Sequence, residues 1–159
     1  MDFNRPHKPP RLHGWDYTTP GYYFVTFNTK VRGQNILAVI SPVGTAALGG
    51  PDVALTSAGR IVQGLIENID RIYPNVHVDC YTIMPDHVHL IIVLGCTDEP
   101  PKAAAPTSLP KVINALKSLA TKRCGVSLWQ DEYYDHIIRN DADLAETRAY
   151  IQNNPLKKD

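Results

Sequence analysis

The stretch that most constrains the fold is residues 84–94, which join a turn to an unbroken apolar run. A proline and an aspartate favour the turn, and the β-branched residues after them are typical of a strand. Every residue from 90 to 94 is apolar, which predicts a strand covered on both faces of its sheet. Because side chains alternate along a strand, His87 and His89 should share one face while Val88 points to the other.

Other segments have the patterns of strands and helices. Aromatic and β-branched residues predict strands, and apolar residues at three- and four-residue steps predict helices. The expected strands span residues 22–28, 76–84, 88–94 and 134–139, and the expected helices span 57–73, 110–124 and 140–154. Residues 32–51 alternate short apolar runs with Gly and Pro, which suggests a hairpin insert.

The order of these segments is strand, helix, strand, strand, helix, strand and a last helix. This order predicts an α+β, ferredoxin-like (RRM-like) antiparallel sheet of βαββαβ order. The additional C-terminal helix, which carries Tyr150, could cover the second face. A chain of 159 residues suits a single domain, here residues 1–159, with an irregular basic arm at 1–20 and a Pro- and Ala-rich connector at 95–110.

Charge is balanced overall, with 16 basic and 16 acidic residues, so net charge alone does not indicate a nucleic-acid partner. Basic side chains nevertheless gather locally, as polyanion-binding patches do. In the first 33 residues they are Arg5, Lys8, Arg11, Lys30 and Arg32, and between residues 101 and 130 they are Lys102, Lys111, Lys117, Lys122 and Arg123. The three cysteines form no C-x-x-C pair, which favours reduced thiols. With no apolar leader and no run long enough for a membrane span, we expect a cytoplasmic protein without a membrane partner.

Four residues could form a catalytic site. His87 and His89 supply half of a metal site, because histidine is the commonest metal ligand; the alternative is two ordinary histidines. Tyr150 and Asn154 are four apart and share a helix face. Their alternatives are an aromatic ring packed at the rim and a residue that simply ends a helix before a proline.

Two imidazoles and an amide oxygen would leave coordination positions open for a substrate phosphate. A tyrosine hydroxyl beside that phosphate could act as the nucleophile. Tyr133 and Tyr134 are rival nucleophiles, which we interpret as packing or base-stacking residues. His136 could orient the site, although a structural histidine is the simpler interpretation.

Three motifs, at residues 84–90, 128–140 and 150–155, resemble those of the REP-associated tyrosine transposases. These proteins belong to the HUH single-strand transposase superfamily, in which U is a hydrophobic residue. The likeness runs from about residue 15 to residue 157, and the stretches 34–55 and 95–108 match least.

The resemblance implies a Mg²⁺- or Mn²⁺-dependent enzyme that cleaves and rejoins single-stranded hairpin DNA through a 5′-phosphotyrosine intermediate. By position, His87 and His89 match the metal pair, Tyr150 the nucleophile and Asn154 the third ligand. Hairpin recognition would use the basic arm and the helix from Lys111 to Arg123. The protein would act as a monomer or a homodimer.

Two other functions remain open from the sequence. A domesticated relative could bind hairpin DNA or RNA without cleaving it, although the intact histidines and tyrosine favour the enzyme. An HUH replication or conjugation initiator is a third class, and nothing in the sequence indicates the helicase domain that accompanies it.

Overall fold

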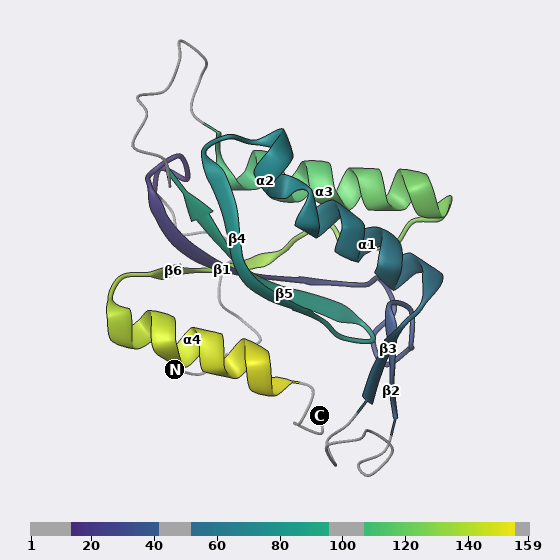
Figure 1. The fold of residues 1–159 in the computed structure, drawn as a ribbon. Coiled ribbons are helices and arrows are strands. Elements are labelled where there is room, and N and C mark those ends of the chain that lie inside the picture. Colours follow the sequence, from purple (N-terminus) through teal and green to yellow (C-terminus); the bar gives the residue numbers. More distant parts are fainter. Residues whose placement is uncertain (1–13, 42–51, 96–106, 155–159) are drawn as a thin grey trace.

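The computed structural model describes residues 14–41, 52–95 and 107–154 (Figure 1). Its centre is an antiparallel sheet of four strands in the order β4-β5-β1-β6. These strands are β1 (Gly21–Asn28), β4 (Val76–Ile83), β5 (His87–Leu94) and β6 (Tyr134–Ile138). The two strands in the middle, β1 and β5, are joined over their whole lengths.

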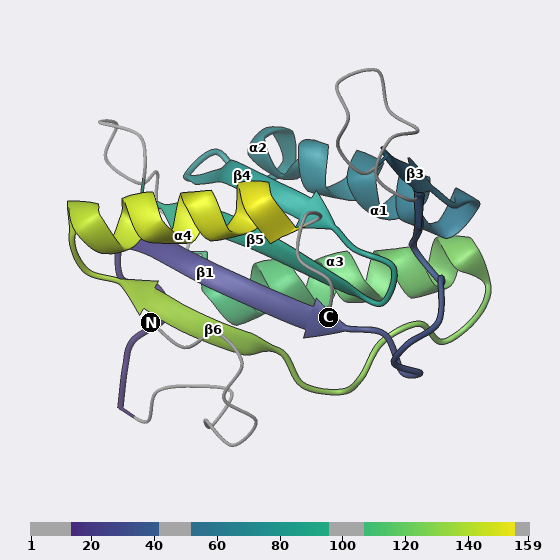
Figure 2. The ribbon, with the colours of Figure 1, turned by 90° about the horizontal axis from the view of Figure 1, so that it is seen from below.

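Helices cover both faces of this sheet. The helices α1 (Ser57–Glu67), α2 (Ile69–Ile72) and α3 (Leu109–Cys124) lie on one face, and α4 (Asp141–Asn153) lies on the other (Figures 1 and 2). Taken along the chain, β1, α1, β4, β5, α3 and β6 follow the predicted βαββαβ order. The predicted α+β, ferredoxin-like class with an additional C-terminal helix is therefore confirmed.

Alternating side chains divide the interior into two clusters. Tyr23, Val25 and Phe27 of β1 pack towards α1 and α3 in the larger cluster. Phe24 points the other way and joins Ile91, Ile138 and Ile151 in a small cluster under α4. The helix α4 therefore rests on far less apolar surface than α1 and α3 do.

Several boundaries differ from the sequence prediction. The expected helix at 57–73 is divided at Asn68, which ends α1 and begins α2. The expected hairpin insert at 32–51 contains only the first strand of the hairpin, β2 (Ala38–Ser41), which pairs with β3 (Asp52–Leu55) just beyond the expected range. Residues 42–51 lie outside the described part of the chain. The three- and four-residue spacing from Val112 and Leu116 predicts that Leu119 faces inward, but this residue is 37% exposed.

The predicted arm at 1–20 is described only from residue 14, and this part packs on the core. Tyr17 is 9% exposed, and its carbonyl accepts a hydrogen bond from the Leu109 N–H at the start of α3. Trp15 donates its indole N–H to the Tyr23 hydroxyl at 3.2 Å. Among the described residues, every helix is too short or too polar to span a membrane.

Two glycines of α1 provide a matched test of this packing. A Cβ at Gly59 would lie 2.0 Å from the Leu37 carbonyl oxygen, whereas one at Gly64 would meet nothing within 4 Å. Gly59→Ala should therefore lower the free energy of unfolding by about 1–3 kcal/mol. Gly64→Ala should raise it by up to about 1 kcal/mol through helix propensity. Urea denaturation of both variants measures this; equal effects of the same sign would contradict the close approach of α1 to residue 37.

Candidate metal and tyrosine site

The two histidines of β5 lie together on the face covered by α4. Their ring centroids are 4.6 Å apart, and the residues are only 6% and 5% exposed. Val88, between them, is fully buried in the cluster under α1 and α3. The prediction that His87 and His89 share one face of the strand, with Val88 on the other, is therefore confirmed.

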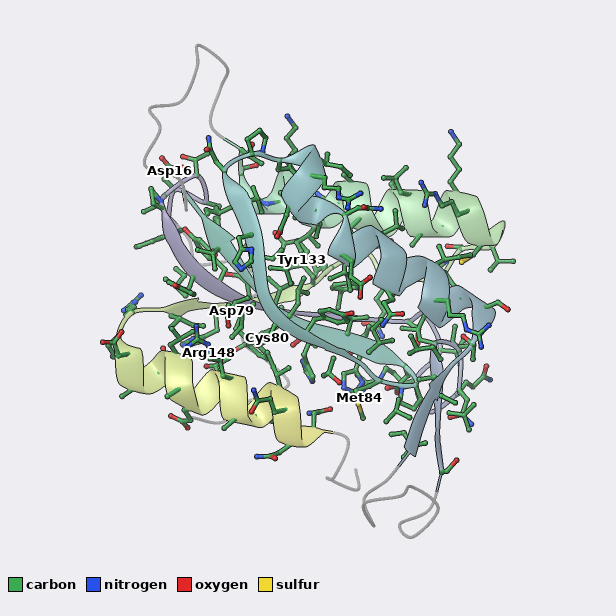
Figure 3. The ribbon with its side chains drawn as sticks, viewed as in Figure 1. Asp16, Asp79, Cys80, Met84, Tyr133 and Arg148 are labelled. Atoms are coloured by element: carbon green, nitrogen blue, oxygen red, sulfur yellow. The ribbon has the colours of Figure 1, made fainter. Side chains whose placement is uncertain are left out.

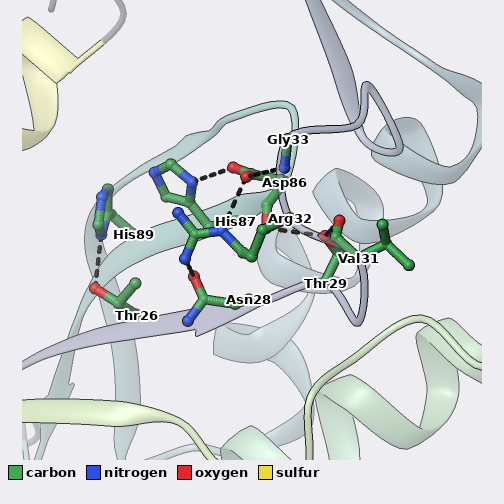
Figure 4. Close-up of polar contacts among 9 residues, drawn as sticks. All are labelled: Thr26, Asn28, Thr29, Val31, Arg32, Gly33, Asp86, His87 and His89. Carbon is green, nitrogen blue, oxygen red and sulfur yellow. Dashed lines mark hydrogen bonds and ion pairs between the residues drawn. The ribbon is translucent and has the colours of Figure 1, made fainter. Parts of the chain in front are cut away.

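Each imidazole is oriented through its Nδ1 atom (Figure 4). His87 Nδ1 lies 2.6 Å from an oxygen of Asp86, and His89 Nδ1 lies 2.6 Å from the Thr26 hydroxyl. Within the described residues neither Nε2 atom has a hydrogen-bond partner. Polar partners that hold one ring nitrogen and leave the other open are typical of metal-binding histidines.

Asp86 connects the first histidine to the loop after β1. One carboxylate oxygen holds His87, and the other accepts hydrogen bonds from the Gly33 N–H and Arg32 Nε, both at 2.9 Å. Burial alone would raise the pKa of Asp86, but the hydrogen bonds from Gly33, His87 and Arg32 hold it at about 2. The carboxylate therefore stays charged at neutral pH.

His89 is neutral for a different reason. Burial lowers its pKa to about 3, and the nearby charges of His87 and Arg32 add to the effect. A neutral imidazole has a free lone pair, which is the form that binds a metal.

The structure brings Tyr150 to these histidines. Its ring lies 5.3 Å from the His89 ring and meets the Phe24 ring edge-on at 6.0 Å, in both cases between centroids. The Tyr150 ring is partly buried and packs at the border of the small cluster, so it makes the rim contact of the alternative interpretation while it also lies beside His89.

The rival tyrosines differ from each other. Tyr133 is 3% exposed and packs in the cluster under α1 and α3, away from the histidines. Tyr134 pairs with Thr26 across β1 and β6, and therefore shares the α4 face with His89. Of the two, only Tyr134 is placed where it could replace Tyr150.

Asn154 follows the last residue of α4 and is 5% exposed. Its side-chain oxygen is buried and has no hydrogen-bond partner among the residues that the structure describes. Burying an unpaired acceptor costs about 1–3 kcal/mol, and a cation would satisfy it. The described residues hold no group of three or more His, Cys, Asp or Glu side chains suited to a metal, so a third ligand from this part of the chain would be of another type. In donor chemistry, two imidazoles and one amide oxygen fit such a metal.

Polar contacts to both edge strands hold α4 in place. Near its start, Asp143 lies 2.9 Å from His136 Nε2 of β6, and this contact joins the histidine to α4. Near its middle, Arg148 donates to both oxygens of Asp79 on β4, at 2.8 and 2.6 Å (Figure 3). A β-bulge after Val78 leaves Asp79 without a partner on β5. The bulge re-aims this part of the strand, and the Asp79 carboxylate meets α4.

The predicted DNA-binding residues fall into three groups. Lys111, Lys122 and Arg123 are exposed on α3, which covers the face opposite to α4. Lys117 is 8% exposed, and its ammonium donates to the carbonyls of Gln130 and Asp131; this geometry corrects our expectation of a surface lysine. The remaining three, Arg5, Lys8 and Arg11, lie outside the described residues.

Sequence reasoning did not place three residues at the site, although it counted one of them, Arg32, in the N-terminal basic patch. Asp86 lies in the histidine motif itself, and its position next to His87 was a usable signal. Thr26 and Arg32 come from β1 and its following loop, and only the pairing of β1 with β5 brings them to the histidines.

The geometry defines a histidine pair facing a helix-borne tyrosine, and comparison with known proteins gives the family. The model of the IS200-like transposases matches residues 58–154, so the chain belongs to this family. An uncharacterized protein of Haemophilus influenzae is 29% identical, over 92% of this chain and 86% of its own length. The REP-associated tyrosine transposase of Escherichia coli is 26% identical, over 89% of this chain and 70% of its own length.

The fold has a solved counterpart. A REP-associated tyrosine transposase bound to a REP hairpin superposes with a TM-score of 0.66 and 22% identity, covering 92% of this chain and 73% of that one. The resemblance drawn from the three motifs is therefore confirmed at the level of family and fold.

The link between α4 and β4 gives a pH-dependent prediction. The hydrogen bonds from Arg148 lower the pKa of Asp79 below its usual 3.8. Asp79→Asn should therefore reduce the free energy of unfolding at pH 7 by about 1 kcal/mol. The pKa of Asp79 is lower in the folded protein than in the unfolded chain. The stability difference between wild type and Asp79→Asn is therefore present above pH 3.8 and disappears as the pH falls through the pKa of Asp79 in the folded protein.

Chemical denaturation between pH 7 and pH 3 measures the effect. The control is a double-mutant cycle with Arg148→Met, in which Asp79→Asn should have almost no further effect. Additive losses, or a difference that does not shrink in acid, would contradict the ion pair.

Proposed function

We propose that this protein is a metal-dependent endonuclease and strand transferase that cleaves single-stranded DNA beside a hairpin through a covalent tyrosine–DNA link. The observation that carries the proposal is the 5.3 Å separation of the Tyr150 and His89 rings, with the second histidine next to the first. Membership of a transposase family supports the substrate class.

Three protein groups would hold the metal. They are Nε2 of His87, Nε2 of His89 and the buried oxygen of Asn154, and each lacks a partner within the described residues. Bound Mg²⁺ or Mn²⁺ would polarise a phosphate oxygen and stabilise the charge that develops on it. Asp86 and Thr26 keep the two rings turned towards that position through Nδ1.

Tyr150 supplies the nucleophile in this proposal. Its hydroxyl loses a proton and attacks the phosphorus atom, and a tyrosine oxygen–phosphorus bond forms as the bond to the 3′ oxygen breaks. The 3′ oxygen takes up a proton and leaves as a 3′ hydroxyl, while the 5′ phosphate stays on the tyrosine. Attack by another 3′ hydroxyl on this link rejoins DNA and restores the tyrosine.

The proposed substrate is single-stranded DNA that contains a hairpin. One solved relative in fold is bound to a REP hairpin, and this chain presents Lys111, Lys122 and Arg123 on α3. Because α3 and α4 cover opposite faces of the sheet, a hairpin held on α3 would have to pass its single-stranded flank round the sheet to Tyr150.

Tyr150→Phe tests the nucleophile. The variant keeps the ring that packs on Phe24 and His89 and removes only the hydroxyl, so stability should change by less than about 1 kcal/mol. The covalent DNA adduct should disappear and cleavage should fall by several orders of magnitude. The measurement is a denaturing gel of labelled hairpin strands incubated with Mn²⁺.

Tyr134→Phe is the control, because Tyr134 shares the α4 face and should not carry the adduct. An adduct that persists in Tyr150→Phe but not in Tyr134→Phe would assign the nucleophile to Tyr134. Cleavage without an adduct in the wild type would indicate attack by water, and hairpin binding without cleavage would indicate a binding module.

Asn154→Ala tests the third metal ligand, and two measurements should move in opposite directions. Without metal, the variant should be as stable as the wild type or up to about 2 kcal/mol more stable, because an unpaired buried oxygen is removed. Its affinity for Mn²⁺, measured by calorimetry, should fall at least about tenfold. The neighbouring Asn153 is exposed, so Asn153→Ala should leave Mn²⁺ affinity unchanged. Unchanged Mn²⁺ affinity in Asn154→Ala would remove this residue from the site.

A further inference from the structure

One cationic side chain beside the histidines has no part in the mechanism above. Arg32, on the loop after β1, has a side chain that is 55% exposed, yet its guanidinium is fixed at two points. Its Nε donates to Asp86 at 2.9 Å, and its Nη1 donates to the side-chain oxygen of Asn28 at 3.0 Å (Figure 4). An exposed arginine held by a fork of two acceptors is pre-positioned and has little rotamer freedom left to lose.

The loop that carries Arg32 is also fixed. The Thr29 N–H donates to the Asp86 carbonyl oxygen at 2.9 Å, and the Thr29 hydroxyl lies 3.1 Å from the same oxygen. Gly33, with a φ of 82° that favours glycine, donates its N–H to the Asp86 carboxylate. Backbone and side-chain contacts to one residue thus set the position of the guanidinium relative to the sheet.

Asp86 also orients His87, a candidate metal ligand. Asp86 binds His87 with one carboxylate oxygen and Arg32 with the other, so the imidazole and the guanidinium are held on a single group. The Nη2 atom of Arg32 has no partner within the described residues. Its two N–H groups remain available to an acceptor beside the histidines.

Stability alone is a weak reason for this arrangement. An exposed ion pair contributes about 0–1 kcal/mol, while an arginine fork matches the geometry of a phosphate. Asp86 and Asn28 already bind the Nε and Nη1 atoms of the guanidinium. We therefore expect the acceptor for its outer Nη2 group to be an anion from outside the protein.

We propose that Arg32 is a phosphate-binding residue, whose Nη2 group binds a backbone phosphate of the single strand that enters the site. The inference rests on the proposed function in that it takes single-stranded DNA as the ligand. It adds a residue that would fix the position of the strand beside His87 through a hydrogen bond to a backbone phosphate, a contact that neither the histidines nor Tyr150 make directly in the proposed function.

The first test measures binding without cleavage. Fluorescence anisotropy with a labelled hairpin oligonucleotide bearing single-stranded flanks, in the absence of metal, should give about tenfold weaker binding for Arg32→Gln. The slope of log affinity against log salt should fall by about 0.7, the value for one lost single-strand contact. Arg60→Gln is the matched control: Arg60 is exposed on α1, on the opposite face of the sheet, and its loss should leave this slope unchanged.

The second test locates the contact. Single phosphates of the flank are replaced in turn by uncharged methylphosphonates, and each oligonucleotide is titrated with wild type and Arg32→Gln. At one position the replacement should weaken binding by the wild type about tenfold and have no further effect on Arg32→Gln. Equal losses in both proteins at every position would overturn the proposal.

A purely structural role gives a different pattern. If Arg32 served only to hold Asp86 and His87, Arg32→Gln would weaken Mn²⁺ binding and leave metal-free DNA binding unchanged, which would overturn the inference. A wild type that binds these strands with the predicted coupling but never cleaves them would refute the proposed catalysis and leave the phosphate contact standing. A wild type that binds no single strand would refute both.

Discussion

The pairing of β1 with β5 is the constraint on which the rest of the site depends. Every residue of β5 is buried, and its antiparallel register places Asn28 opposite His87 and Thr26 opposite His89. This register lets Thr26 orient one imidazole and brings the loop after β1 to Asp86. A slip of one residue would turn both imidazoles to the other face of the sheet, among the apolar side chains under α1 and α3.

The two faces of the sheet are stabilised by different physical means. Under α1 and α3 the core is large and apolar, and under α4 only four residues form the buried apolar cluster. Contacts of Asp143 with His136 and of Arg148 with Asp79 tie α4 to the two edge strands. Apolar burial tolerates small sliding, whereas hydrogen bonds fix direction and distance. The position of the tyrosine helix is therefore set mainly by polar contacts.

Local pattern predicted the elements, and long-range contacts account for what it missed. The shared face of the two histidines followed from strand alternation, and the last helix was expected from residue 140, which is the residue that caps α4. The ion pair of Asp79 with Arg148 joins residues 69 apart, and no periodic signal marks it. Lys117 has the same limit: the local gathering of basic residues indicated a surface lysine, while the carbonyls that bind it come from another segment.

Two departures from local rules lie on the α4 side of the sheet. Two buried imidazoles interrupt an otherwise apolar strand, and an unpaired amide oxygen lies at the end of α4. Each feature costs stability, since buried polar groups are expensive unless they are paired, and Tyr150 lies among them. When sequence and packing agree elsewhere, such local conflicts are expected at functional sites. This is the physical reason for proposing a ligand at this site, because within the described residues a cation would satisfy the atoms of the histidines and Asn154 that have no partner.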